Sequence, residues 1–272
     1  MKIKNNKTTI SKVIIFTLFL FTIITLSFSN IKGQELNIYV NKDFNITNPD
    51  GTYNNPFKTL EDAISHAGNN ATIMIQTDFS IDEFNINKDL IIMSSDKTIK
   101  GEQNNTKFEL NTKVGRIIVE PGNSLTLQNI IINGNASNET PNTKQAIQVG
   151  KIDSDEISKL IINDETLIKN THRANDGGSA IVLSNAKLYM NGGEISNNFN
   201  NTGLTIIGVD SSRENHSSIY LTGGNIINNN ISGSVIATHK GLKELVIGGN
   251  ININNNQNVL HIPINRVKVK DD

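Results

Sequence analysis

The sequence predicts an all-β fold, a right-handed parallel β-helix (solenoid) with a short N-terminal capping helix. Short apolar strands recur through residues 114–262, separated by turns rich in Asn and Gly. The 272 residues include 43 Asn and 42 Ile, which favour turns and strands respectively. The repeat length varies from one unit to the next. Hairpins alone do not explain that variation, whereas stacked coils absorb insertions in their turns without losing register.

Residues 1–33 are predicted to be a signal peptide or an N-terminal anchor. A lysine-rich start precedes an uncharged apolar stretch at 13–29, and small residues suited to cleavage follow at Ser27, Ser29 or Gly33. The apolar stretch is at the short end for a membrane span, so cleavage and retention are both open. Either outcome predicts a secreted or cell-surface protein, and the absence of Cys fits export without disulfides.

Residues 34–113 are predicted to form an N-terminal cap and the first coils. Residues 59–67 (TLEDAISHA) read as a helix, with Thr59 as N-cap and Asp62 completing a capping box in place of Glu. A helix before the coils would cover apolar side chains and strand edges at the open end of the core.

Residues 114–272 are predicted to hold the repeated coils. Each unit reads as strand, turn, strand, Gly-Gly or polar turn, strand, and Asn-rich turn. The middle strands begin, at spacings of 35, 28, 31 and 26 residues, at Leu125, Leu160, Leu188, Ile219 and Leu245. Each is preceded by another strand, and these lie at 117–120, 146–149, 180–183, 204–207 and 235–238, with 259–262 repeating the pattern once more.

Strand alternation assigns side chains to the core or to the surface. The pairs Leu188/Met190 and Ile219/Leu221 are expected to point inward. Tyr189 and Tyr220 are then outward at the same place in consecutive units, where stacked rings could bind a sugar or simply pack across the strands. The matching positions in other units are Thr126, Ile161 and Val246.

Asparagines at the end of the third strand of each unit are expected to stack as an amide ladder that satisfies turn backbone groups. The residues predicted for this ladder are Asn197, Asn228 and Asn254. The Gly pairs before them most simply permit a tight turn.

The segments 38–40 (IYV), 50–57 (DGTYNNPF), 59–67 and 71–75 (ATIMI) resemble the N-terminal region of pectate-lyase-like right-handed parallel β-helix proteins. The later Asn- and Gly-rich copies resemble adhesin-like microbial surface proteins. This resemblance implies an exported surface module for adhesion or structure, with a surface glycan or a host or neighbour-cell protein as partner. Because the superfamily includes pectate lyases and polygalacturonases, it also implies an alternative, a polysaccharide lyase or glycoside hydrolase.

The sequence favours a protein without catalytic activity over that alternative. Lyase chemistry needs a cation held by clustered carboxylates and a base, and hydrolysis needs paired acids. On a β-helix these groups would stack on outward positions of the first strand. The expected outward positions, of which one is acidic, are Ile118, Glu120, Gln148, Val182, Ser184, Thr205, Ile207 and Ala237. We therefore assign no catalytic residues.

Two groups containing His were weighed as chemical sites. His172, Arg173 and Asp176 could supply acid, base and oxyanion-binding groups, but their loop context favours a solvated turn. Three further His residues fall in different coils without metal-ligand spacing, and these are His216, His239 and His261.

Asp153, Asp155 and Glu156 form an acidic turn whose oxygens could hold calcium. The remainder of a calcium-loop pattern is missing, so a solvated turn is favoured and no cofactor is expected. A net charge of −1 argues against nucleic acid as the main partner. No C-terminal cap is recognisable in 266–272, so we expect a further chain, an oligomer or sequence missing from this chain to cover that edge.

Overall fold

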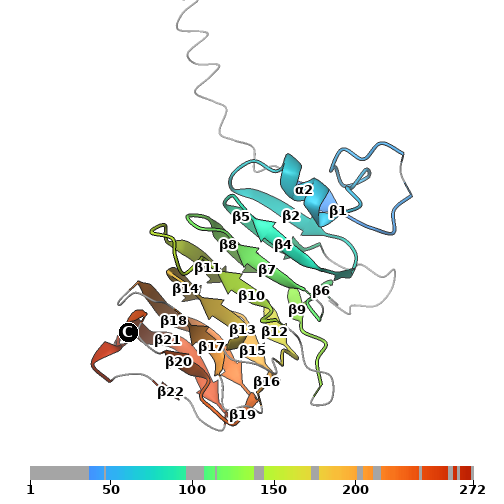
Figure 1. Ribbon diagram of the computed structural model, residues 1–272. Coiled ribbons are helices and arrows are strands. Elements are labelled where there is room, and N and C mark those ends of the chain that lie inside the picture. The colour runs from blue at the N-terminus through green and yellow to red at the C-terminus, as the bar shows by residue number, and fades with distance from the viewer. Residues whose placement is uncertain are drawn as a thin grey trace, which may run out of the picture. The chain divides into compact units, whose positions relative to one another are not determined.

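The computed structural model describes residues 37–45, 47–95, 107–113, 115–137, 144–172, 178–200, 205–210, 216–238, 241–256, 260–261 and 264–270. Residues 37–272 make one compact unit. Within it the named strands pair in parallel, coil upon coil, and form a parallel β-helix (Figure 1). The signal peptide or anchor predicted for 1–33 lies outside the described residues.

Each coil contributes strands to three faces. The first face consists of β1 (Asn37–Val40), β2 (Ala71–Ile75), β5 (Leu90–Ser94), β8 (Ser124–Gln128), β11 (Ser158–Ile162), β14 (Ala186–Met190), the first halves of β18 (Ser217–Ile227) and β21 (Leu242–Asn254), and β23 (Val267–Val269). The second face consists of β3 (Phe79–Ser80), β6 (Glu109–Asn111), β9 (Ile131–Asn133), β12 (Leu167–Lys169), β15 (Glu194–Ser196) and the second halves of β18 and β21.

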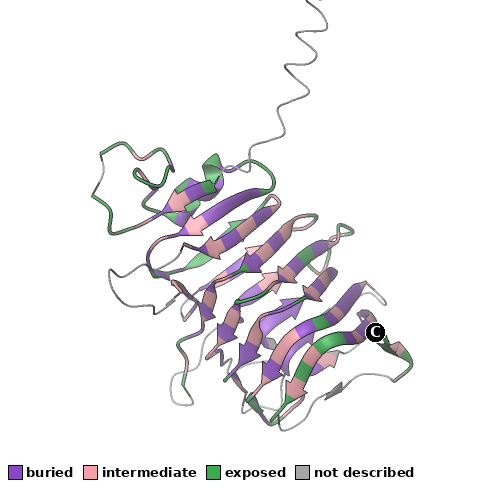
Figure 2. Ribbon diagram, turned by 180° about the vertical axis from the view of Figure 1, so that it is seen from behind, coloured by how far each residue is buried: buried purple, intermediate pink, exposed green. Residues whose placement is uncertain are grey.

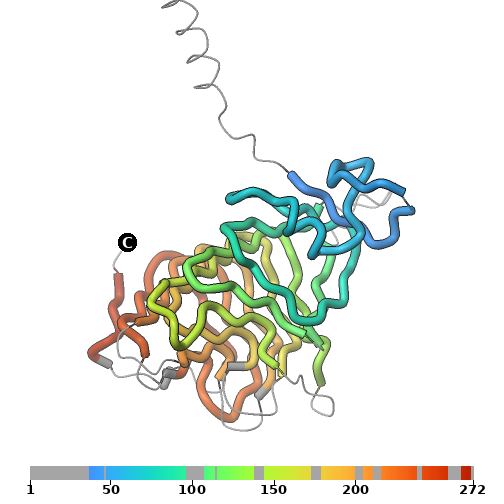
Figure 3. Tube along the Cα trace, turned by 45° about the horizontal axis from the view of Figure 1, so that its top comes forward, coloured from blue at the N-terminus to red at the C-terminus, as the bar shows by residue number. Residues whose placement is uncertain are grey.

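The third face consists of β4 (Glu83–Ile86), β7 (Arg116–Val119), β10 (Ile147–Val149), β13 (Gly178–Leu183), β17 (Thr205–Val209), β20 (Ile236–Thr238) and β22 (Leu260–His261). A small pair, β16 (Phe199–Asn200) and β19 (Asn230–Ile231), follows the second face. A short 3-10 helix, η1 (Ile264–Arg266), leads into β23. Figure 3 follows these coils in order along the chain trace.

The register of the first face confirms the predicted repeat. The five predicted start positions pair in succession, in the order Leu125, Leu160, Leu188, Ile219 and Leu245. The same column extends back to Leu90 and Ala71 and forward to Val267. Across the predicted boundary at 113/114 the stack is continuous, because β5 pairs with β8 and β4 with β7.

The side chains predicted to point inward form the core. Leu188, Met190, Ile219 and Leu221 are all fully buried, as are their in-register partners Leu160, Ile162 and Leu245, while Ile247 opposite Leu221 is partly buried. Figure 2 shows the resulting alternation of buried and partly exposed residues along the strands. Burial of these stacked aliphatic side chains supplies the main driving force for the fold.

The expected surface exposure was wrong for Ile207 and also for Val182, Ser184 and Thr205, which are 4%, 4% and 5% exposed. Ile207 is fully buried and pairs with Ile181 and Ile236. The register between β13 and β17 shifts after Gly178, so Gly208 takes the outward position beside Val182. A β-bulge moves the following residues to opposite faces, which strict alternation does not anticipate.

The predicted capping helix is α2 (Leu60–His66), at the N-terminal end of the coils (Figure 1). The Thr59 hydroxyl accepts from the Asp62 amide at 3.1 Å and donates to the Asp62 carboxylate at 2.7 Å. Leu60, Ala63 and Ile64 are buried in the core. At the other end of the helix, Lys88 donates to the carbonyls of Ile64 and Ala67 at 3.0 and 2.9 Å, which satisfies acceptors that the helix leaves unpaired.

An asparagine ladder exists, but one position later than predicted for Asn197 and Asn228. Those two residues have positive φ, at 53° and 56°, and shape the turn, while Asn254 is exposed in β21. The ladder consists of Asn198 and Asn229, both buried, and the partly exposed Asn256. Asn tolerates the left-handed conformation better than most residues, so consecutive asparagines divide the two tasks of turning the chain and stacking.

The described C-terminal end is partly uncovered. Strand β23 pairs with only Leu245–Ile247 of β21, and Val269 is 74% exposed. Ile253 is partly exposed, although its in-register partner Ile226 is fully buried. A further chain or an oligomer at this edge stays a prediction.

Candidate functional site

The tyrosines occupy the outward column that their spacing predicted. Tyr189 of β14 pairs directly with Tyr220 of β18. We call the in-register positions Thr126, Ile161, Tyr189, Tyr220 and Val246 the tyrosine column; Val246 is buried, and the register continues to Ile91 and Lys268. Both tyrosines are partly exposed, because inward and outward side chains alternate and Leu188 and Leu221 take the core positions.

The two phenol rings stack on each other. Their centroids are 4.8 Å apart and their planes differ by 8°. Each ring therefore covers one face of its neighbour, a spacing set by the distance between parallel strands. A ligand that approaches this face of the β-helix therefore contacts the edges and hydroxyls of the two rings. It does not meet a flat ring face, as it would on a platform of outward-facing aromatic rings.

Glu244 and Lys268 hold the side chain of Tyr220 in place. The Tyr220 hydroxyl donates to Glu244 Oε1 at 2.8 Å, and the other carboxylate oxygen accepts from Lys268 Nζ. Lys268 and then Tyr220 lower the pKa of Glu244 below its ordinary value. Burial, followed by the hydrogen bond to Glu244, raises the pKa of Tyr220. The phenol therefore stays protonated and oriented at neutral pH.

Polar groups flank the tyrosine column on both sides. On one side Lys159 and Lys187 pair in register beside it. On the other, Asn191 donates to the Asn163 side chain at 3.2 Å and accepts from the Thr222 hydroxyl at 3.2 Å. Asn163, Asn191 and Thr222 each follow a residue of the tyrosine column by two positions, so aromatic, cationic and amide groups share one lateral strip.

Sequence reasoning missed Glu244 and Lys268. The predicted alignment of Leu245 with Ile219 already placed Glu244 opposite Ser218, two residues before the tyrosine column. A diagonal neighbour on a parallel sheet is within reach of a long side chain, as Tyr220 is here. Lys268 lies in β23, a strand that the repeat search did not recognise.

The third face offers a separate outward column. Its described outward residues on successive strands are Asn85, Ile118, Gln148, Val182, Gly208 and Ala237. This column carries no carboxylate, whereas lyase chemistry requires a clustered set. Gln148 donates to Ser184 at 3.0 Å and accepts from the buried Gln145, which links adjacent coils.

One carboxylate on the third face is held between two cations. Glu83 Oε2 accepts from Arg116 Nε at 2.9 Å and from Lys144 Nζ at 2.7 Å. The hydrogen bond from Lys144 is the largest influence lowering the pKa of Glu83. With a single acid and both cations engaged, this cluster forms a surface ion-pair network between coils.

The calcium candidates lie on an exposed turn. Asp153, Asp155 and Glu156 are all exposed. The turn is held by a side chain of the neighbouring coil, because Asn185 Nδ2 donates to the carbonyls of Ile152 and Ser154 at 3.0 and 2.7 Å. Among the described residues, this turn included, no group of three or more His, Asp or Glu side chains could hold a metal ion.

His172 is buried, and the solvated turn expected around it is wrong for this residue. It is 4% exposed, and its Nδ1 lies 3.0 Å from the Ser137 carbonyl oxygen. Its predicted neighbours Arg173 and Asp176 lie outside the described residues, as does His239. His216 is partly exposed ahead of β18, and His261 lies in β22 opposite Ala237.

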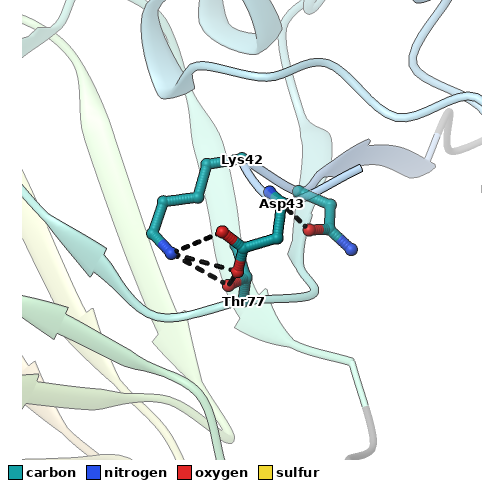
Figure 4. A network of polar contacts seen from close by, with 4 residues as sticks. Lys42, Asp43 and Thr77 are labelled. Carbon is teal, nitrogen blue, oxygen red and sulfur yellow. Dashed lines mark hydrogen bonds and ion pairs between the residues drawn. The ribbon is translucent and has the colours of Figure 1, made fainter. Parts of the chain in front are cut away.

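A further polar network ties the N-terminal loop to the first coil (Figure 4). Asp43 accepts from Thr77 Oγ1 at 2.6 Å and from Lys42 Nζ at 3.0 Å. The Thr77 bond, followed by Lys42, lowers the pKa of Asp43. Figure 4 shows the three side chains converging on one another, an arrangement that anchors this loop.

Comparison with protein-family models, curated proteins and solved structures found no match to this chain. Within the part of the chain that the structure describes, no helix has the length and apolar character needed to cross a membrane.

Proposed function

We propose that this protein is an exported surface module of the adhesin-like β-helix type, which binds a surface glycan along its first face. The observation that carries the proposal is the lateral strip in which the tyrosine column runs between Lys159/Lys187 and the Asn163–Asn191–Thr222 row. Ring edges, hydroxyls and amides are groups that hydrogen-bond and pack against sugars.

The geometry of the strip favours an extended ligand. Equivalent side chains repeat at the spacing of neighbouring strands, about 4.8 Å. A polymer lying along the coils would meet Tyr189 and Tyr220 on successive strands together with their polar neighbours, and several weak contacts would add to one affinity. The rigid core beneath the strip keeps the binding groups in place, which limits the entropy lost on binding.

A glycan array probed with the purified protein tests this proposal. The matched variants are Tyr189→Thr and Tyr220→Thr, since Thr126 already occupies the same column. Tyr53→Thr is the control, because Tyr53 is 62% exposed on the N-terminal loop and outside the strip. We expect each column variant to weaken glycan binding by about tenfold, equivalent to about 1.4 kcal/mol, and the control to bind as wild type.

Glycan binding that is insensitive to both column variants would place the site elsewhere. Binding to host or neighbouring cells that survives enzymatic removal of their glycans would indicate a protein partner. The enzymatic alternative, a lyase or glycoside hydrolase, has a direct assay: polygalacturonate and calcium are supplied, and absorbance of unsaturated product is followed.

A further inference from the structure

The composition restricts where this protein can be oxidised. It has no Trp and no Cys, so its four tyrosines and four methionines are the main oxidisable side chains. All four tyrosines are described, and they form two pairs of different geometry. Tyr189 and Tyr220 are stacked, whereas Tyr39 and Tyr53 meet edge to face at 85°, with centroids 5.3 Å apart.

The stacked pair has the geometry that phenoxyl coupling needs. One-electron oxidation of tyrosine leaves spin density on the ring carbons beside the hydroxyl-bearing carbon, and two such carbons must meet to form a bond. Direct pairing of Tyr189 with Tyr220 across parallel strands places like atoms of the two rings side by side. The two rings are therefore held next to each other, which gives each phenoxyl radical a high effective concentration at the other ring.

A proton acceptor is already in position. The Tyr220 hydroxyl donates to Glu244 Oε1 at 2.8 Å. Loss of an electron makes a phenol strongly acidic, so a carboxylate within hydrogen-bond distance can take the proton as the electron leaves. Lys268 pairs with the same carboxylate and keeps it ionised and ready to accept.

We propose that Tyr189 and Tyr220 are an oxidative cross-linking site, at which a one-electron oxidant joins the two rings by a carbon–carbon bond. Each phenol gives up one electron and its hydroxyl proton, that of Tyr220 passing first to Glu244. The radicals then couple through one ring carbon each, and the hydrogens on those two carbons move as protons to the two ring oxygens. With a haem peroxidase as the oxidant, one hydrogen peroxide takes up the two electrons and two protons and becomes two water molecules.

The product is a covalent staple between β14 and β18, the strands of adjacent coils. It joins residues that are 31 positions apart in the sequence. Such a link restricts the unfolded chain in the same way as a disulfide, in a protein that has no Cys. This inference does not depend on glycan binding.

The test is peptide mapping after oxidation of the dilute, purified protein with peroxidase and hydrogen peroxide. Trypsin separates the tyrosines into different peptides, 188–213 and 214–240 for the stacked pair, and 33–42 and 43–58 for the other. We expect a monomer that carries dityrosine fluorescence and a 188–213/214–240 conjugate, whose mass is the sum of the two peptides less two hydrogens.

Tyr189→Phe and Tyr220→Phe should each abolish the conjugate, while Tyr39→Phe should leave its yield unchanged. Glu244→Gln should slow its formation several-fold, because the amide does not accept the phenol proton. Circular dichroism shows whether each variant is folded. If a variant is not folded, the peptide map of the oxidised wild-type protein tests the proposal by itself. The proposal is overturned if the conjugate is absent, if it forms equally well in denaturant, or if 33–42/43–58 cross-links as readily.

Discussion

Replacing Asn229 by Ala would remove the centre of the asparagine ladder. Its side chain is 1% exposed and makes four hydrogen bonds. Its oxygen accepts from the backbone and side-chain nitrogens of Asn198 at 3.1 and 3.0 Å. Its nitrogen donates to the Ile195 carbonyl and to the Asn256 side chain, both at 3.0 Å.

The expected loss in the free energy of unfolding follows from these four hydrogen bonds. An amide has two donors and two acceptor sites, and all four are used here. At about 1 kcal/mol for each bond lost, Asn229→Ala should lower the free energy of unfolding by about 4 kcal/mol. The loss is larger than for an exposed Asn because the partners of Asn229 on two neighbouring coils are left buried without a replacement.

Urea unfolding followed by circular dichroism measures the effect on the whole stack. Coils in a solenoid contact mainly their neighbours, so unfolding of the variant need not be a single transition. Hydrogen exchange gives the local answer, and we expect protection to fall first at the amides of Asn198 and Thr171, which lie on the coils below Asn229.

Asn228→Ala is the matched control. Asn228 is exposed and has a φ of 56°, so the change costs about 1 kcal/mol of left-handed strain without breaking the ladder. If Asn228→Ala destabilised the protein as much as Asn229→Ala, the ladder would not be the stabilising element and the reasoning would be refuted.

Two other predictions concern the cap and the tyrosine column. Thr59→Ala removes both hydrogen bonds of the capping box and should cost about 1 kcal/mol, measured by thermal unfolding, while Thr59→Ser keeps the hydroxyl and should cost less. The pKa of Tyr220 is raised above 10.0, so its contribution to stability is complete below pH 10.0 and is lost as the pH rises through the folded value. Tyr220→Phe should accordingly remove the highest-pH part of the tyrosinate absorbance; an unchanged titration curve would contradict this assignment.

The repeat was predictable because its signal is strong. Leucine or isoleucine recurs at each start from Leu125 to Leu245. A register shift of one residue would move all the core side chains of a strand to the surface. The earlier coil at Leu90 was not identified as a copy because residues 95–108 separate β5 from β6, where the later copies have only a short turn between the corresponding strands. The cap was predictable for a different reason, since Thr59 and Asp62 form a local motif that needs no distant partner.

Three features were not predicted correctly because each depends on three-dimensional geometry that a regular sequence period does not contain. Runs such as Asn197–Asn198 contain the same residue twice, and only backbone φ decides which one turns the chain and which one stacks. The bulge after Gly178 shifts Ile207 inward, and a regular two-residue period contains no trace of it. The Glu244 contact to Tyr220 runs diagonally between coils, so a search along single columns passes over it.

The direction of the main-chain hydrogen bonds determines how the β-helix responds to tension along its axis. Those bonds join each coil to the next, and a pull on the two ends therefore loads the boundaries between coils in series. The weakest boundary yields first, and the force it withstands does not grow with the number of coils.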